Sequence, residues 1–112
     1  MAEIEPAIQM CDAAVTLAFS VLGKRWNGMI VSTLGSGATS FVSLRRAVVG
    51  ISDTVLSDRL TELTQAGLVT RTVDSGPPIT VSYSLTSSGK GLLPILGQLG
   101  EWASANLELP EH

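Results

Sequence analysis

The sequence predicts a mostly helical α+β fold of the winged helix-turn-helix type. A short helical segment, a turn at Gly50 and a longer amphipathic helix follow one another, and a two-stranded hairpin comes directly after them. The chain has 112 residues, 45% of them hydrophobic and 4% aromatic, which suits one domain with an aliphatic core. We therefore expect a single domain over residues 1–112. Its expected parts are an N-terminal arm and helix (1–22), a helix-turn-helix (40–67), a wing (68–86) and a C-terminal dimerisation helix (87–107).

Two helices are expected ahead of the helix-turn-helix. Residues 1–12 are polar and mixed and predict an extended arm or a short helix, while residues 13–22 are helix formers. Gly23 ends the first helix, and Asn27 is expected to cap a second one over residues 27–34. The apolar positions expected to be buried in this second helix are Ile30, Val31 and Leu34.

The helix-turn-helix is expected between a short helix, 41–48, and a longer helix, 53–66. Ser40 and Ser52 are good N-caps for these two helices, and Gly50 breaks the chain between them. Their spacing places one apolar side of each helix inward. The expected inward residues are Phe41, Leu44, Val48, Leu56, Leu60 and Leu63.

A wing is expected where the sequence period changes from helical to alternating. Residues 68–73 are β-prone, and residues 79–85 alternate apolar and polar side chains. The turn that joins these two segments is expected at residues 75–78. The tip of this hairpin contains no Lys or Arg. It still offers hydroxyl and backbone amide donors to a phosphate at Ser75 and Gly76.

The C-terminal helix, 87–107, is expected to start at a Thr86 cap and to be kinked at Pro94. Its apolar stripe is longer than a domain of this size can cover, and large exposed apolar patches are rare on monomers. We therefore expect a homodimer, to which the N-terminal helix contributes a second apolar face; the alternative is that the C-terminal helix folds back on its own domain. The expected interface residues are Leu17, Val21, Leu92, Ile95, Leu96, Leu99 and Trp102.

The charge is unevenly distributed along the chain. The net charge is −3, but residues 24–71 hold six basic and three acidic residues and so carry +3, which leaves −6 for the remainder. A basic middle between acidic ends is what a DNA-facing surface on an acidic protein would produce, although small counts also scatter by chance.

The outward side of helix 53–66 is the candidate for reading DNA. A recognition helix uses its N-terminal residues on base edges, and short hydroxyls and a carboxylate can bond there; the alternative is an ordinary amphipathic surface helix. Arginines on and before this helix suit phosphates, but Arg59 is equally placed to pair with Glu62. The candidate DNA-binding residues are Arg45, Arg46, Ser52, Asp53, Thr54, Ser57, Asp58, Arg59, Ser75 and Gly76.

Composition argues against enzyme chemistry, a metal site or a cofactor. The only histidine is His112, and the only cysteine, Cys11, excludes an intramolecular disulfide. Asp12 beside Cys11 disfavours a reactive thiolate, so an inert thiol is expected; the alternative is an intersubunit disulfide with a redox role. No apolar stretch approaches the roughly 18 residues of a membrane helix, and the acidic start is unlike a secretory signal, so a cytoplasmic location away from membranes is expected.

Several motifs together resemble the HxlR family of bacterial transcription regulators and, more distantly, MarR-type regulators. They are GKRW at 23–26, GIS at 50–52, LSDRLTEL at 56–63, GLVTR at 67–71 and VSYSLTSSG at 81–89. The resemblance implies a homodimer, formed by the N- and C-terminal helices, on a palindromic DNA operator. It also implies a small-molecule or redox effector, since some members sense oxidants through an N-terminal cysteine. The alternative function is a winged-helix protein–protein interaction module without DNA binding, which the net acidity and the base-free wing tip would suit.

Overall fold

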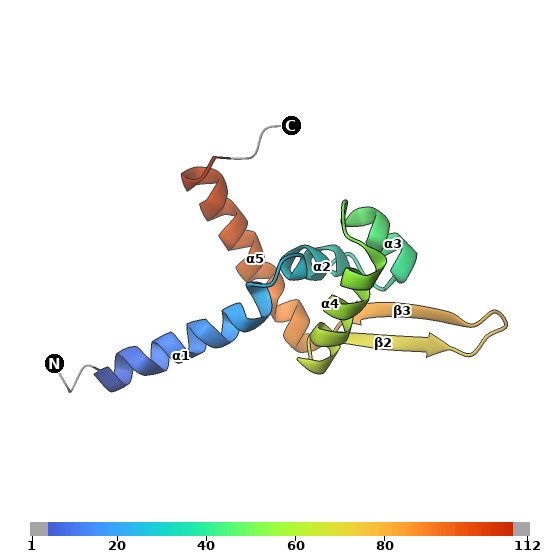
Figure 1. Cartoon of the computed structure of the whole chain (residues 1–112), viewed down its shortest axis with the longest axis horizontal. Coiled ribbons are helices and arrows are strands. Elements are labelled where there is room, and N and C mark those ends of the chain that lie inside the picture. The colour runs from blue at the N-terminus through green and yellow to red at the C-terminus, as the bar shows by residue number, and fades with distance from the viewer. Residues whose placement is uncertain (1–4, 109–112) are drawn as a thin grey trace.

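A computed structural model describes the backbone of residues 5–108 and the side chains of residues 12–108 (Figure 1). The elements are α1 (Glu5–Leu22), α2 (Asn27–Leu34), β1 (Thr39–Ser40), α3 (Phe41–Ala47), α4 (Asp53–Gln65), β2 (Val69–Asp74), β3 (Thr80–Leu85) and α5 (Ser87–Asn106). This order confirms the predicted winged helix-turn-helix, with α3 and α4 as its two helices and β2–β3 as its wing.

The core lies where α2, α3 and α4 meet the base of the wing. Every residue of α2 and α4 that the helical spacing placed inward is buried, and so are Leu44 and Val48 in and after α3. Phe41 is half-buried and packs against the same cluster. The buried apolar residues are Ile30, Val31, Leu34, Leu44, Val48, Ile51, Leu56, Leu60, Leu63, Val69 and Leu85.

The sheet has three antiparallel strands in the order β1-β3-β2. The central strand places Tyr83 opposite Thr39 of β1 on one side and opposite Arg71 of β2 on the other. The short strand β1 was not expected, because two residues are too few to form an alternating pattern. It joins the start of α3 to the wing.

The predicted serine and threonine caps are confirmed. Ser40 Oγ accepts the backbone N–H of Ser43 at 3.1 Å, and Ser52 Oγ accepts that of Val55 at 3.2 Å. Thr86 Oγ1 accepts the N–H of Gly89 at 3.1 Å and donates its own proton to the Gly67 carbonyl at 2.6 Å. Thr86 therefore fixes the start of α5 against the end of α4.

Of the two alternatives for residues 1–12, an extended arm or a short helix, the structure shows helix from Glu5 onward, but without the expected break before residue 13. Residues from Glu5 onward belong to the same helix as residues 13–22, so α1 is one helix of 18 residues instead of an arm followed by a helix. Pro6 lies in its first turn, where a missing backbone N–H costs no helical hydrogen bond.

Asn27 does not cap α2 as predicted. It is buried, and its side-chain Nδ2 donates to the Val21 carbonyl at 2.7 Å. That carbonyl lies in the last turn of α1, where the helix itself supplies no partner. The N-cap position of α2 is occupied by Trp26, which has a φ of 84° and makes no side-chain cap bond. The asparagine thus joins α1 to α2.

The connection between α3 and α4 turns at Gly50, which has a φ of 95°. A Cβ there would lie 3.5 Å from the Trp26 ring, so the turn packs beside the connection between α1 and α2. This backbone conformation is unfavourable for any residue with a Cβ, which explains why a glycine occupies this turn.

The two terminal helices extend away from the core. Figure 1 shows α1 and the wing leaving opposite sides of the core and α5 leaving in a third direction, and the molecule measures 64 × 35 × 24 Å. The helix α5 packs on α2 and β3 and is continuous from Ser87 to Asn106, with Pro94 inside it. Large parts of both helices are therefore open to solvent.

Candidate nucleic-acid interface

The outward side of α4 is a polar surface held on a buried leucine stripe. Leu56, Leu60 and Leu63 are at most 2% exposed and fix this helix on the core. The opposite side is exposed along its whole length, from the first turn to the last. Its residues are Asp53, Thr54, Ser57, Asp58, Thr61 and Gln65. The predicted base-reading residues of α4 therefore share one accessible face, and Ser52 stands just before it as the N-cap.

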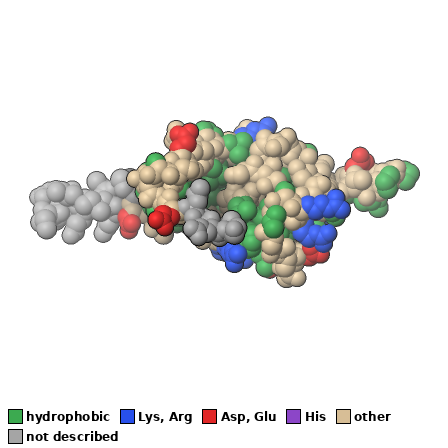
Figure 2. All heavy atoms as spheres, turned by 90° about the horizontal axis from the view of Figure 1, so that it is seen from above, with side chains coloured by type: hydrophobic (Ala, Val, Ile, Leu, Met, Phe, Trp, Pro, Cys, Tyr) green, Lys and Arg blue, Asp and Glu red, His purple; other side chains and the backbone are tan. Residues whose placement is uncertain are grey.

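Arg45 and Asp53, both predicted DNA contacts, bind each other. Arg45 Nη1 lies 3.0 Å from Asp53 Oδ1 and 3.3 Å from Oδ2, and both side chains are exposed. In Figure 2, basic and acidic side chains lie next to one another on the wing side of the core. An exposed pair of this kind is worth little free energy, so DNA can compete for the arginine.

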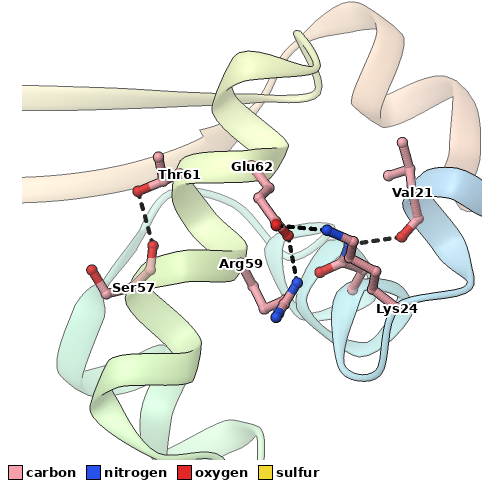
Figure 3. A network of polar contacts seen from close by, with 7 residues as sticks. Val21, Lys24, Ser57, Arg59, Thr61 and Glu62 are labelled. Carbon is pink, nitrogen blue, oxygen red and sulfur yellow. Dashed lines mark hydrogen bonds and ion pairs between the residues drawn. The ribbon is translucent and has the colours of Figure 1, made fainter.

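A second network connects α4 to the connection between α1 and α2 (Figure 3). Glu62 accepts a bond from Lys24 Nζ at 2.7 Å and another from Arg59. The Lys24 ammonium, and then the charge of Arg59, hold the pKa of Glu62 below its ordinary value of 4.5. Of the two roles considered for Arg59, the structure therefore shows the pairing with Glu62.

The remaining basic residues of the 24–71 segment differ in their surroundings. The Arg25 guanidinium lies 4.3 Å from the centre of the Trp26 ring, within reach of a cation–π interaction. Arg46 and Arg71 are exposed and take part in no ion pair among residues 12–108. These two guanidinium groups are the ones most readily available to an incoming anion.

The wing tip offers fewer donors than predicted. The backbone N–H of Gly76 already donates to the Asp74 side chain at 3.1 Å, which leaves the exposed Ser75 as the predicted donor at the tip. Val73 and Ile79 are exposed nearby, and the tip appears mainly as hydrophobic surface in Figure 2. The tip therefore has little positive charge with which to hold DNA.

A groove of about 360 Å³ lies between α4 and the base of the wing. One wall of the groove is a side of α4. The other wall is formed by the side chains of Arg71 in β2 and Tyr83 in β3, which are opposite one another in the sheet. Sequence reasoning did not select Arg71, because its position beside α4 depends on the packing of the wing and on the strand register. The complete lining is Ser57, Leu60, Thr61, Thr64, Gln65, Arg71 and Tyr83.

The residues predicted to form a dimer interface fall into two groups. Leu17, Ile95, Leu99 and Trp102 are between 48% and 71% exposed. The others, Val21, Leu92 and Leu96, pack against the core of their own chain. An apolar groove of about 490 Å³ runs between α2 and α5 beside Leu99, and small residues such as Gly28, Gly100 and Ala103 form part of its walls.

Three further features considered from the sequence are a reactive cysteine, a metal site and a membrane-spanning helix. Cys11 belongs to α1, but its side chain lies outside the described residues. Among the described residues, no three His, Cys, Asp or Glu side chains gather as metal ligands. None of the described helices combines the length and the apolar character needed to span a membrane.

Known proteins share this sequence pattern. The model of the HxlR-like helix-turn-helix family matches residues 21–111. The chain is 42% identical over 87 residues to the uncharacterized HTH-type transcriptional regulator YvaP of Bacillus subtilis (strain 168), covering 78% of this chain and 81% of that one. It is 40% identical over 86 residues to the HTH-type transcriptional regulator YodB of the same organism, covering 77% of each.

Solved structures share the fold as well. The reduced form of the transcriptional regulator YodB from B. subtilis superposes with a TM-score of 0.78 and 36% identity, covering 86% of this chain and 94% of that one. The oxidized form of the redox regulator HypR gives a TM-score of 0.78 and 33% identity, covering 86% and 99%.

Proposed function

The chain belongs to the HxlR-like helix-turn-helix family of transcriptional regulators, and we propose that it binds a palindromic DNA operator as a homodimer. The single observation that carries the proposal is the exposed polar face of α4, which is anchored from behind by Leu56, Leu60 and Leu63. A helix held in this way can enter the major groove and present Thr54 and Ser57 to base edges.

The proposed dimer rests on the apolar surface of the terminal helices. Leu17, Phe19, Ile95 and Trp102 are each more than half exposed in a single chain. A second copy that covers these side chains would remove a large apolar patch from water, which single soluble chains rarely expose. Two copies related by a twofold axis would present two α4 helices to the two halves of a palindrome.

A gel-shift experiment at two salt concentrations tests DNA binding. The probe is the DNA upstream of the protein's own gene, and a duplex of the same length and shuffled sequence is the control. We expect a shift of the upstream DNA at the higher salt concentration, where the shuffled duplex no longer shifts, because base contacts survive salt better than phosphate contacts. Equal behaviour of the two duplexes would contradict a sequence-specific operator.

A protein–protein interaction module remains the second candidate function. It is favoured by the pairing of Lys24, Arg45 and Arg59 with acids and by the absence of a base at the wing tip. The same gel shift separates the two functions. A module without DNA binding would leave both duplexes unshifted even at the lower salt concentration.

We also propose a small-molecule effector that changes operator binding in the cytoplasm, where the proposed DNA target lies. An oxidant that acts on Cys11 is the alternative, which the expected inertness of that thiol disfavours. Among the solved structures that this chain resembles are the redox regulator HypR and a quinone-bound form of YodB. Titrating the gel shift with a quinone and, separately, with diamide tests the two effector classes.

A further inference from the structure

We propose that the groove between α4 and the wing is a binding site for one backbone phosphate of DNA, with Arg71 as its principal ligand. This inference rests on the proposed function and adds a residue that the sequence did not indicate. The site needs no movement of the wing, because Arg71 and Tyr83 already face α4 across the groove.

The lining of the groove matches the chemistry of a phosphodiester. It contains one cation, Arg71, and no carboxylate, while its other polar groups are hydroxyls and the Gln65 amide. A phosphodiester carries one negative charge and accepts hydrogen bonds without donating any. An arginine with free N–H groups can bind such an anion through two parallel bonds.

The hydroxyl groups of the groove divide into used and available donors. Thr61 Oγ1 donates to the Ser57 carbonyl at 3.0 Å, and Thr64 Oγ1 donates to the Leu60 carbonyl at 2.7 Å. The hydroxyls of Ser57 and Tyr83 donate to no acceptor among residues 12–108. Together with Arg71, these two groups supply donors from both walls of the groove.

Arg71 differs from Arg45 and Arg59 in that no acid is bound to it among the described residues. Arg45 is bound to Asp53 and Arg59 to Glu62, so each must leave an acid before it binds DNA. Arg71 has no ion-pair partner among the described residues and is exposed. Binding a phosphate there replaces only water.

The position of the groove suits the path of a DNA strand. Ser57 and Thr61 belong both to the outward face of α4 and to the wall of the groove. The major groove is about 12 Å wide, so a helix that enters it has a phosphate backbone along its flank. The wing side of α4 is one such flank, and Arg71 places positive charge there although the tip has none.

The test compares three variants of the whole chain by fluorescence anisotropy with the upstream duplex and the shuffled duplex over a series of salt concentrations. We expect Arg71→Gln to weaken binding to both duplexes and to reduce the salt slope by about one, because one phosphate contact is lost. Tyr83→Phe, which removes only the hydroxyl, should weaken binding to both duplexes with the slope unchanged. Lys90→Gln is the matched control, since Lys90 is an exposed base on α5 outside the groove.

The outcomes separate this inference from the proposed function. If the unaltered protein binds DNA and Arg71→Gln leaves affinity and slope unchanged, the phosphate site is wrong and the function stands. If Lys90→Gln reduces the slope as much, the effect is one of net charge and the site is equally wrong. If the unaltered protein binds neither duplex, the proposed function fails and the phosphate site with it.

A variant that keeps the charge guards against misfolding. Arg71→Lys should restore the salt slope while leaving the affinity below that of the unaltered protein, because an ammonium cannot form the two parallel bonds. Titration with inorganic phosphate at constant ionic strength, followed by the amide NMR signals of residues 57–71, tests the other source of the anion. We expect only weak, non-saturating shifts; saturable binding that competes with DNA would assign the groove to a free anion instead.

Discussion

At the scale of single residues, three of the six basic side chains of the 24–71 segment are bound to acids. Lys24 and Arg59 share Glu62, and Arg45 binds Asp53. The Arg45–Asp53 pair is exposed and contributes little free energy, so an incoming phosphate would displace its acid at a small cost. In the proposed complex, these pairs would lower the attraction for any DNA without determining which sequence is bound.

Arg45→Ala is expected to weaken binding to operator and shuffled DNA alike and to reduce the salt slope by about one. The reason is that α3 precedes α4 and would cross the DNA backbone, where Arg45 can exchange Asp53 for a phosphate. Anisotropy titrations over a salt series measure both quantities. An unchanged affinity would remove Arg45 from the set of phosphate contacts.

Thr54→Ala is expected to cost about 1–3 kcal/mol of binding free energy on the operator and little on shuffled DNA. Thr54 is exposed in the first turn of α4, where a recognition helix meets base edges. The two affinities are compared at one salt concentration. An equal loss on both duplexes would show that the residue positions the helix without reading bases.

Oxidation is expected to change operator binding little. Cys11 is the only thiol, and the carboxylate of its sequence neighbour Asp12 disfavours the reactive thiolate. Gel shifts before and after diamide, with Cys11→Ser as the control, measure the effect. A disulfide-linked dimer on a non-reducing gel, together with loss of binding that Cys11→Ser prevents, would overturn this expectation.

At the scale of the elements, α4 is held on the core by its buried leucines and is bound to the connection between α1 and α2 through Glu62. The carboxylate connects α4 to Lys24, which lies in the connection between α1 and α2. Nearby, Asn27 ties the same connection to the end of α1. The orientation of α4 is thus coupled to the C-terminal end of α1.

Glu62→Gln is expected to make the free energy of unfolding less dependent on pH in the acidic range. The pKa of Glu62 is lowered in the folded protein by Lys24 first and Arg59 next, so its stabilising effect is present above its ordinary value of 4.5 and is lost as the pH falls through the lowered pKa. Urea unfolding at several pH values tests this. The difference in midpoint between the unaltered protein and Glu62→Gln should shrink on acidification, and a constant difference would contradict the account.

The elements of the fold were largely predictable from the sequence, whereas the contacts between them were not. Helical spacing identified the buried side of α4 because Leu56, Leu60 and Leu63 follow one another at intervals of four and three residues, which places them on one side of a helix. The role of Asn27 was misjudged because asparagine suits both an N-cap and a buried amide bond. Arg71 was missed because the groove it lines forms only when the wing packs beside α4.

At the scale of the whole molecule, α1 and α5 carry apolar side chains that the other described residues leave exposed. Trp102 is the largest of them on α5 and is 55% exposed. Its burial in a dimer would stabilise the assembly by roughly 2–3 kcal/mol. Trp102→Ala is therefore expected to shift the protein toward monomers and to weaken operator binding, which sedimentation velocity and anisotropy measure. A dimer as stable as the unaltered one would place the interface elsewhere.

The mass of the complex with operator DNA shows whether the protein binds its operator as a dimer. Sedimentation equilibrium of the fluorescently labelled upstream duplex, with protein in excess at low micromolar concentration, gives the number of chains bound to each duplex. We expect two chains of 11.7 kDa to bind each duplex together, with no complex of intermediate mass. A complex that contains a single chain, or a duplex that sediments alone, would contradict it.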